Sequence, residues 1–309
     1  MIIDEVQKLP LLLDEVHSLI EDKQLRFVLT GSSARKLRRA GINLLGGRAR
    51  VLRLHPLVSS EIGDYDLERI LTFGSLPAIY DSDEPWQDLK AYSGTYLKEE
   101  IAAEGAARRL DAFSRFLHIA ALYSGKQVNF EAWSSDAAVP ARTVREYFSV
   151  LSDTLIGEML EPWKSGKKRK PASTGKCYFF DIGVRNALAG IQSIAPGTDE
   201  YGNAFEHFIY EELRAWLDYH RDDRPLTFWR TQDKKEVDFI VGDEIAIEVK
   251  AAELPQYRHL KGLIAIADEA TFKHRILVCQ APEPRLSEGI EILPVKVFLE
   301  ALWADTLIE

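Results

Sequence analysis

Two apolar segments separated by three residues constrain the last third of this chain more than any other feature. Residues 236–241 read Glu-Val-Asp-Phe-Ile-Val, and residues 245–250 read Ile-Ala-Ile-Glu-Val-Lys. Short apolar runs of this kind are typical of buried strands, so the pair predicts a hairpin inside an α/β unit. Because side chains alternate between the two faces of a strand, Glu248 and Lys250 share one face, while the isoleucines and the valine occupy the other.

The register of this hairpin decides whether Asp238 can meet Glu248. A regular two-residue turn at Gly242–Asp243 would set Asp238 opposite an isoleucine and bury its carboxylate among apolar side chains. A three-residue connection, or a bulge, pairs Val241 with Ile245 and sets Asp238 opposite Glu248. Burying an unpaired polar group costs roughly 2–7 kcal/mol. We therefore predict the three-residue connection or the bulge, with the two carboxylates close enough to share one cation.

The order Asp238, Glu248, Lys250 resembles the Asp-x(n)-Glu-x-Lys signature of the PD-(D/E)xK nucleases. The resemblance implies that Asp238 and Glu248 hold Mg²⁺, which clamps a phosphodiester oxygen, and that Lys250 positions or activates water. It also implies that Glu206, on an amphipathic helix expected from residue 201 to 220, adds a further carboxylate. The alternative is a solvated Glu-Lys pair on an exposed sheet face, with no catalytic role.

The N-terminal residues predict part of a second sheet. A strand at Ile2–Ile3 and another over Arg26–Leu29 flank a helical pattern. Strands that alternate with helices predict a parallel sheet covered by helices, here residues 1–62. Such a partial sheet would leave apolar side chains such as Ile3 and Val28 uncovered, and large apolar patches drive association. We therefore expect self-association or a loosely ordered N-terminus.

Polar residues follow both of these strands. Asp4 and Glu5 come after the first strand, and Thr30 and Ser32 come after the second. In P-loop ATPases, the Walker B strand ends in carboxylates that help to hold Mg²⁺ and polarise the attacking water. Thr30 or Ser32 could sense a γ-phosphate, and Arg48 could face a neighbouring nucleotide. The alternatives are an exposed strand end and a solvated loop arginine.

The phosphate-binding loop of such ATPases is not found in this sequence. That loop reads Gly-x-x-x-x-Gly-Lys-Ser/Thr, and the pairs at Gly125, Gly166 and Gly175 lack both the leading glycine and the hydroxyl residue. We therefore expect no measurable ATP binding or hydrolysis by this chain alone, and ATP as a cofactor only in an intact, longer form. The alternative is a fragment of an ordinary ATP-hydrolysing protein, which the in-frame DNA upstream of Met1 would reveal.

The middle of the chain, residues 63–195, predicts helices and a winged-helix unit. One helix begins near Asn129, Pro140 marks a turn, a second helix follows from Thr143, and a polar hairpin would form the wing. The hairpin carries a dense run of basic residues, namely Lys164, Lys167, Lys168, Arg169, Lys170 and Lys176. The formal net charge is -9, so any contact with DNA phosphates needs a local basic patch of this kind. A solvated loop is the alternative.

Several segments resemble one family of AAA-type ATP-binding proteins of bacteria and archaea whose C-terminal half is a domain of unknown function. They lie at residues 4–10, 29–34, 54–57, 96–101, 178–183 and 236–239, in the family's order. The resemblance implies an α/β chain with a partial P-loop-type parallel sheet in residues 1–62, a helical and winged-helix middle in 63–195, and a restriction-endonuclease-like α/β domain in 196–309. This sequence departs from the family by starting at Walker B.

Composition excludes several other classes of protein. Cys177 and Cys279 lie too far apart in sequence for a disulfide framework or a zinc site. No signal peptide is recognisable, and no apolar run approaches the ~18 residues of a membrane span. The sequence therefore predicts a reduced cytoplasmic protein without membrane contact. The leading hypothesis is a P-loop-deficient AAA-type relative that binds DNA and cuts it with Mg²⁺, and the rival is a non-catalytic DNA-binding or assembly scaffold.

Overall fold

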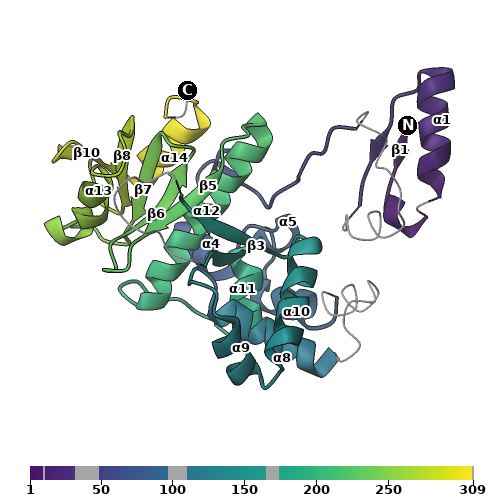
Figure 1. Cartoon of the computed structure of the whole chain (residues 1–309), viewed down its shortest axis with the longest axis horizontal. Helices are drawn as coiled ribbons and strands as arrows, with labels where there is room; N and C mark the ends of the chain where they lie inside the picture. The colour runs from purple at the N-terminus through teal and green to yellow at the C-terminus, as the bar shows by residue number, and fades with distance from the viewer. Residues whose placement is uncertain (10, 32–48, 97–109, 165–173, 308–309) are drawn as a thin grey trace.

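The computed structural model describes residues 1–9, 11–31, 49–96, 110–164 and 174–307. The chain is mixed α/β, as predicted. A small N-terminal segment is joined by an extended connection to a larger body of helices and one long sheet (Figure 1). Among the described residues, no helix combines the length and the apolar character that a membrane span requires.

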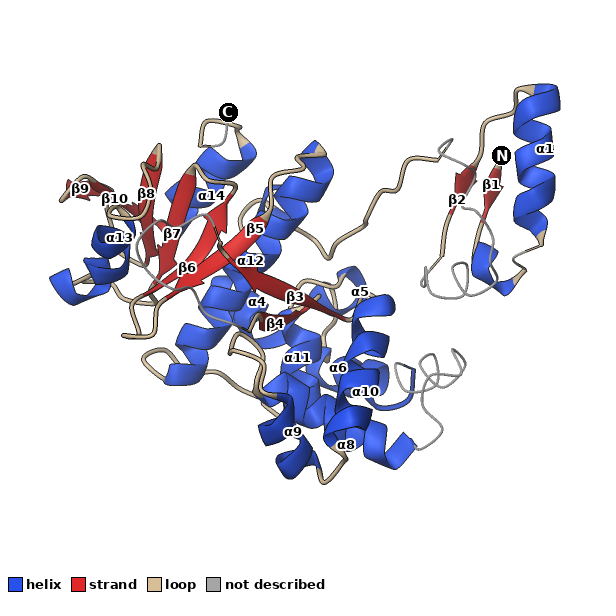
Figure 2. Cartoon of the chain, in the orientation of Figure 1, coloured by secondary structure: helices blue, strands red, loops and turns tan. Residues whose placement is uncertain are grey.

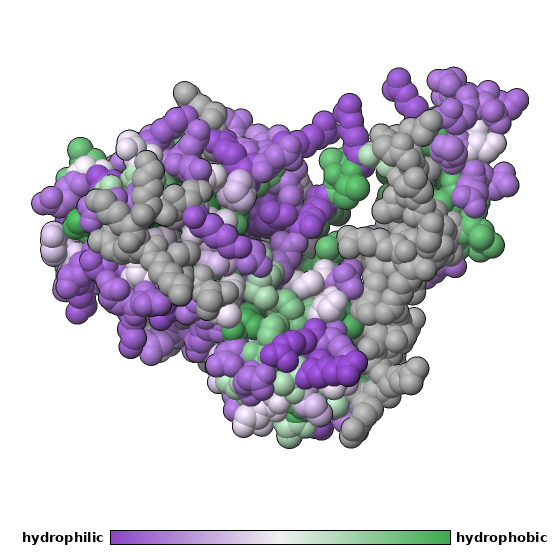
Figure 3. Space-filling model, viewed as in Figure 1, coloured by the Kyte–Doolittle hydropathy of each residue, from purple (hydrophilic) through white to green (hydrophobic). Residues whose placement is uncertain are grey.

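The N-terminal segment contains two parallel strands and a helix. Strands β1 (Ile2–Ile3) and β2 (Val28–Leu29) pair in the register Ile2 to Val28. A short 3-10 helix, η1 (Val6–Lys8), and helix α1 (Leu12–Lys23) connect them. Ile2 is 75% exposed and Val28 58% exposed, and apolar surface is visible on this segment (Figure 3). The predicted uncovered face is present at Val28, whereas Ile3 is half-buried.

The middle of the chain is helical. The bounds of its helices are α3 (Ser59–Ile62), α4 (Leu67–Phe73), α5 (Pro77–Tyr80), α6 (Pro85–Ala91), the π-helix η3 (Tyr92–Tyr96), α8 (Leu110–Leu122), α9 (Phe130–Ala137), α10 (Ala141–Asp153) and α11 (Ile182–Ala189). Asn129 caps α9 through its side chain, and Pro140 precedes α10, as predicted. Helices α8, α9 and α10 enclose an aromatic core around the fully buried Trp133. The assignment of this unit as a winged helix remains a prediction.

One sheet of eight strands joins the middle of the chain to its C-terminal part. Its order is β4 (Lys176–Phe179), β3 (Gly157–Pro162), β5 (Leu226–Arg230), β6 (Glu236–Val241), β7 (Ile245–Val249), β8 (His274–Cys279), β10 (Ile290–Pro294) and β9 (Arg285–Ser287). The predicted hairpin β3–β4 is present, and β3 pairs in parallel with β5. The sheet is therefore continuous across residue 195 (Figure 2).

Helices cover both faces of this sheet. Helix α12 (Asp199–His220) and helix α14 (Val295–Trp303) pack on one face, where Phe205, Phe239 and Ile247 share a core. The 3-10 helix η4 (Tyr257–Leu260) and helix α13 (Lys261–Ile266) pack on the other. Because β5 to β8 are covered on both sides, most of their residues are buried. A charged side chain in these strands must find a partner inside the protein.

Candidate functional site

The predicted register of the hairpin β6–β7 is confirmed. Val241 pairs with Ile245 and Phe239 pairs with Ile247, so the connection has three residues. Asp238 directly precedes the paired Phe239, and its carboxylate and that of Glu248 both lie within 3.3 Å of Lys250 Nζ. The backbone N–H of Val249 donates to Asp238 Oδ2 at 2.8 Å, which fixes the carboxylate beside the neighbouring strand.

Lys250 joins the two carboxylates. Its Nζ lies 2.7 Å from Glu248 Oε1 and 3.3 Å from Asp238 Oδ2. Asp238 is 4% exposed and Glu248 6% exposed, whereas 36% of the Lys250 side chain is exposed. The structure thus brings together the three residues of the predicted signature, and Lys250 lies on the solvent side of the group.

A second lysine, Lys176, lies on the inner side of the same group. Its Nζ lies 2.7 Å from Glu236 Oε1, 3.0 Å from Glu206 Oε1 and 3.8 Å from Asp238 Oδ1. Only 3% of its side chain is exposed. The interpretation of Lys176 as part of a DNA-contacting basic run is therefore wrong, because a sealed ammonium cannot reach a phosphate.

Two further residues complete this cluster. The Tyr178 hydroxyl donates to Glu206 Oε1 at 2.5 Å, and Arg230 Nη1 lies 3.0 Å from Glu236 Oε2. Glu206 therefore lies in the group, as expected, whereas Lys176, Tyr178, Glu236 and Arg230 were not predicted as site residues. The alternation that places Glu248 and Lys250 on one face also places Lys176 and Tyr178 on one face of β4.

The charges in this cluster hold each other in defined protonation states. Burial alone would lower the pKa of Lys176, but Glu206, Glu236 and Asp238 outweigh it and hold that pKa above its usual value. Burial would raise the pKa of Asp238, yet Lys250 and Lys176 hold it below its usual value. Burial and the Asp238 charge raise the pKa of Glu248 well above its usual value. The two lysines therefore favour the ionised form of Asp238, whereas burial and the Asp238 charge favour the protonated form of Glu248.

One oxygen of the site has no partner. Glu248 Oε2 is buried and makes no hydrogen bond among the described residues. An unpaired buried carboxylate oxygen is costly unless a cation or a proton satisfies it. The described residues contain no set of three or more His, Cys, Asp or Glu side chains arranged to hold a metal ion. A divalent ion here would therefore rest on Asp238 and Glu248, with water completing its shell, as is common for Mg²⁺.

The structure describes three of the five residues that were predicted to contact a nucleotide. Asp4 and Thr30 meet at the ends of the parallel strands, where the Thr30 hydroxyl donates to Asp4 Oδ1. The Glu5 carboxylate lies 3.2 Å from Lys8 Nζ. Ser32 and Arg48 lie outside the described residues.

Of the basic residues that were predicted to contact DNA in the hairpin loop, the structure describes only Lys164. Lys164 follows β3 and is exposed. Lys167, Lys168, Arg169 and Lys170 lie outside the described residues.

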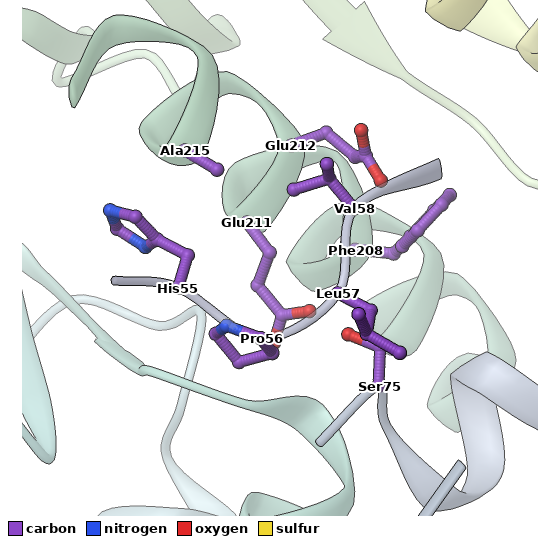
Figure 4. Close-up of a pocket in the computed structure, with 9 residues that line it drawn as sticks. All are labelled: His55, Pro56, Leu57, Val58, Ser75, Phe208, Glu211, Glu212 and Ala215. Atoms are coloured by element: carbon purple, nitrogen blue, oxygen red, sulfur yellow. The ribbon is translucent and has the colours of Figure 1, made fainter. Parts of the chain in front are cut away.

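A second group of carboxylates, Glu211 and Glu212, lies between α12 and the connecting segment, which is residues 49–58. Glu212 accepts hydrogen bonds from the backbone N–H and the hydroxyl of Ser59, at 2.7 and 2.8 Å, and from Trp303 Nε1 at 2.6 Å. Figure 4 shows Glu211 beside it, facing the connecting segment at Pro56. The cavity there has a volume of about 10 Å³, room for roughly one water molecule. This group anchors the connecting segment and has no space for a substrate.

Comparison with known proteins finds similar domains and relatives, but none of them has a stated activity. Residues 1–63 match an AAA domain, residues 64–195 match a domain of unknown function (DUF8612), and residues 201–298 match another (DUF4143). The AAA domain and DUF4143 matches support an AAA-type family. Uncharacterised proteins of Mycobacterium tuberculosis and Mycobacterium bovis are each 26% identical over 265 residues, which cover 82% of this chain and 59% of theirs. The chain thus spans about 59% of their length. No solved structure matches significantly.

Proposed function

We propose that the C-terminal part of this AAA-type relative is a Mg²⁺-dependent nuclease. Its DNA-cleaving site would consist of Asp238, Glu248 and Lys250. The observation that carries the proposal is the arrangement of the two strands. The β6–β7 register brings the Asp238 and Glu248 carboxylates to one ammonium, and it leaves Glu248 Oε2 buried without a hydrogen-bond donor. A divalent cation is the partner that this oxygen lacks.

The roles of the three residues follow from their chemistry. Asp238 and Glu248 would hold the cation, which supplies Lewis-acid polarisation of a phosphodiester oxygen when it is bound. Lys250 is the partly exposed member of the group, so its ammonium can orient a water molecule or contact a phosphate. The exposed Lys164 and its basic neighbours would bind the DNA backbone. ATP binding is proposed only for a longer form that carries a phosphate-binding loop.

The test measures cation binding first and DNA cleavage second. We expect the whole chain to bind Mn²⁺ in an electron paramagnetic resonance titration and to nick supercoiled plasmid in Mg²⁺ or Mn²⁺. Asp238→Asn should lose both properties, because it removes a charged ligand. Glu283→Gln is the matched control, since this exposed carboxylate lies in the turn between β8 and β9 and should leave both unchanged. Equal Mn²⁺ binding by the wild-type chain and Asp238→Asn would refute the site.

A non-catalytic scaffold is the second candidate, and Lys176 is the observation that favours it. Two lysines already neutralise much of the carboxylate charge inside the sheet. A charge network of that kind can specify how β4, α12 and β6 assemble. A wild-type chain that binds DNA in a gel-shift titration but ignores Mn²⁺ would support the scaffold and exclude the nuclease.

A further inference from the structure

Lys176 differs from Lys250 in position and surroundings. Lys250 belongs to the strand end that carries Glu248 and is partly open to solvent. Lys176 comes from β4, which is separated from β6 by two strands, β3 and β5, in the sheet order, and its side chain is sealed. Its Nζ also lies 5.3 Å from the centre of the Phe228 ring. Lys176 is therefore not placed to touch a substrate, although it lies against the carboxylates of the proposed site.

The ammonium of Lys176 has the surroundings of a bound cation. Three carboxylates, from Glu206, Glu236 and Asp238, face it at 3.0, 2.7 and 3.8 Å. An ammonium has three N–H donors and no acceptor. The Glu206 and Glu236 oxygens lie within hydrogen-bond distance of it, whereas the Asp238 oxygen contributes its charge from farther away. Taking such a charge out of water costs several kcal/mol per ion unless it is compensated. The three carboxylates supply that compensation.

Asp238 links this position to the proposed metal position. Its Oδ2 faces Lys250 and the backbone N–H of Val249, and its Oδ1 faces Lys176. One carboxylate thus presents one oxygen to each of two cation positions. In nucleases that use two metal ions, the ions lie about 3.5–4 Å apart on either side of the reacting phosphate.

We propose that the Lys176 ammonium is a built-in cation that occupies the place of a second divalent ion, so that the nuclease site takes a single ion at Asp238 and Glu248. This inference rests on the proposed function. Lys176 acts through Glu206, Glu236 and Asp238 and is a positioning residue. Removing its charge leaves the carboxylates of Glu206, Glu236 and Asp238 without their shared counter-charge, and a divalent cation can bind there once these side chains close around it.

The test counts Mn²⁺ ions bound by the full-length chain. We expect one equivalent for the wild type and two for Lys176→Met, which shortens the side chain by one atom and removes its charge. Lys90→Met is the matched control, because it removes one positive charge from an exposed lysine on α6. The control should bind one equivalent, as the wild type does. Circular dichroism confirms that each variant is folded.

The difference between the variant and the wild type tests the inference, and the wild-type number tests the proposed function. A wild type that binds no Mn²⁺ overturns the nuclease proposal, whatever the variant does. Equal numbers for the wild type and Lys176→Met overturn the role of Lys176. If Lys176→Met folds only when Mn²⁺ is added, the divalent ion has replaced the ammonium and the inference stands. If the variant stays unfolded at every Mn²⁺ concentration, a divalent ion cannot take that place and the inference fails.

Discussion

A single methyl group added at Gly262 tests how closely α13 must approach the candidate site. Gly262 is buried near the start of α13, and a Cβ there would lie 1.8 Å from the backbone oxygen of Glu236 and 3.4 Å from Glu248 Oε2. Ordinary contacts begin near 3.4 Å, so the helix would have to move away from β6 by more than 1 Å. The obstacle is backbone, which cannot rotate aside as a long side chain can.

Two opposing effects set the expected magnitude for Gly262→Ala. Alanine is favoured over glycine inside a helix by roughly 0.5–1 kcal/mol. Overpacking a closed core costs typically about 1–3 kcal/mol. We expect a net loss of about 1–2 kcal/mol in the free energy of unfolding, because the clash is with main-chain atoms. Mn²⁺ binding should weaken as well, since the moved helix lies beside Glu248.

Urea unfolding, followed by circular dichroism, measures this loss as a lower midpoint at an unchanged slope. Gly202→Ala is the matched control. Gly202 lies in α12, and a Cβ there would meet no atom within 4 Å. This control should be as stable as the wild type or more stable, by up to about 1 kcal/mol. A Gly262→Ala chain as stable as the Gly202→Ala chain would show that α13 does not need its close approach to β6.

Two further predictions concern stability. Burial lowers the pKa of His207 to about 3, so the folded state keeps this ring neutral. The unfolded chain takes up the proton near pH 6.5, so this ring should lower the free energy of unfolding by about 1.6 kcal/mol between pH 6.5 and about 5. Burial raises the pKa values of Asp181 and Glu212 to about 6, so these two carboxyls act in the opposite direction. Urea midpoints at both pH values should therefore fall more, or rise less, in the wild type than in His207→Gln, and an equal change would contradict this origin. Asn129→Ala removes the acceptor that caps α9 through two 3.1 Å bonds and should cost about 1 kcal/mol. Asn129→Asp keeps an acceptor, and equal midpoints for these two variants would count against the cap.

The sequence predicted the part of the site that depends on local geometry. Alternation along β7 places Glu248 and Lys250 on one face, and the cost of a buried carboxylate selects the three-residue connection that pairs Val241 with Ile245. Both arguments use residues only a few positions apart in the chain. The helix and turn signals at Asn129 and Pro140 were also local, and the structure has those helices where they were expected.

Lys176 shows where this reasoning stops. Its position depends on the parallel pairing of β3 with β5, whose partners Glu161 and Thr227 lie far apart in the chain. No turn length fixes such a register, and the basic neighbours of Lys176 favoured a solvated hairpin. One signal was present: Lys176 begins the run Lys-Cys-Tyr-Phe, whose four residues are all buried. A lysine in a strand that apolar residues fill needs an internal partner, for the same reason that Glu248 does.

The cluster crosses the boundary between the two matched C-terminal regions. Lys176 and Tyr178 belong to residues 64–195, whereas Glu206, Glu236 and Asp238 belong to residues 201–298. A fragment that starts at residue 196 would keep the carboxylates and lose the ammonium that three of them face. Such a fragment would also expose the edge of β5 that β3 covers. The number of metal ions bound by such a fragment would therefore not describe the site of the full chain.

The connecting segment contacts strand β3, which pairs with the strand that carries Lys176. Arg53 forms an ion pair with Glu158 on β3, and the Tyr210 hydroxyl donates to the same carboxylate at 3.3 Å. The Tyr210 ring stacks on Tyr178 at 4.2 Å, and Tyr178 donates to Glu206. A continuous set of contacts therefore runs from the segment that follows the N-terminal strands to the carboxylates around Lys176. The β3–β4 hairpin, which carries Lys176, is therefore held by Arg53 on one side and by α12 on the other. Measurements of the Lys176 cluster consequently require the chain from Arg53 onward.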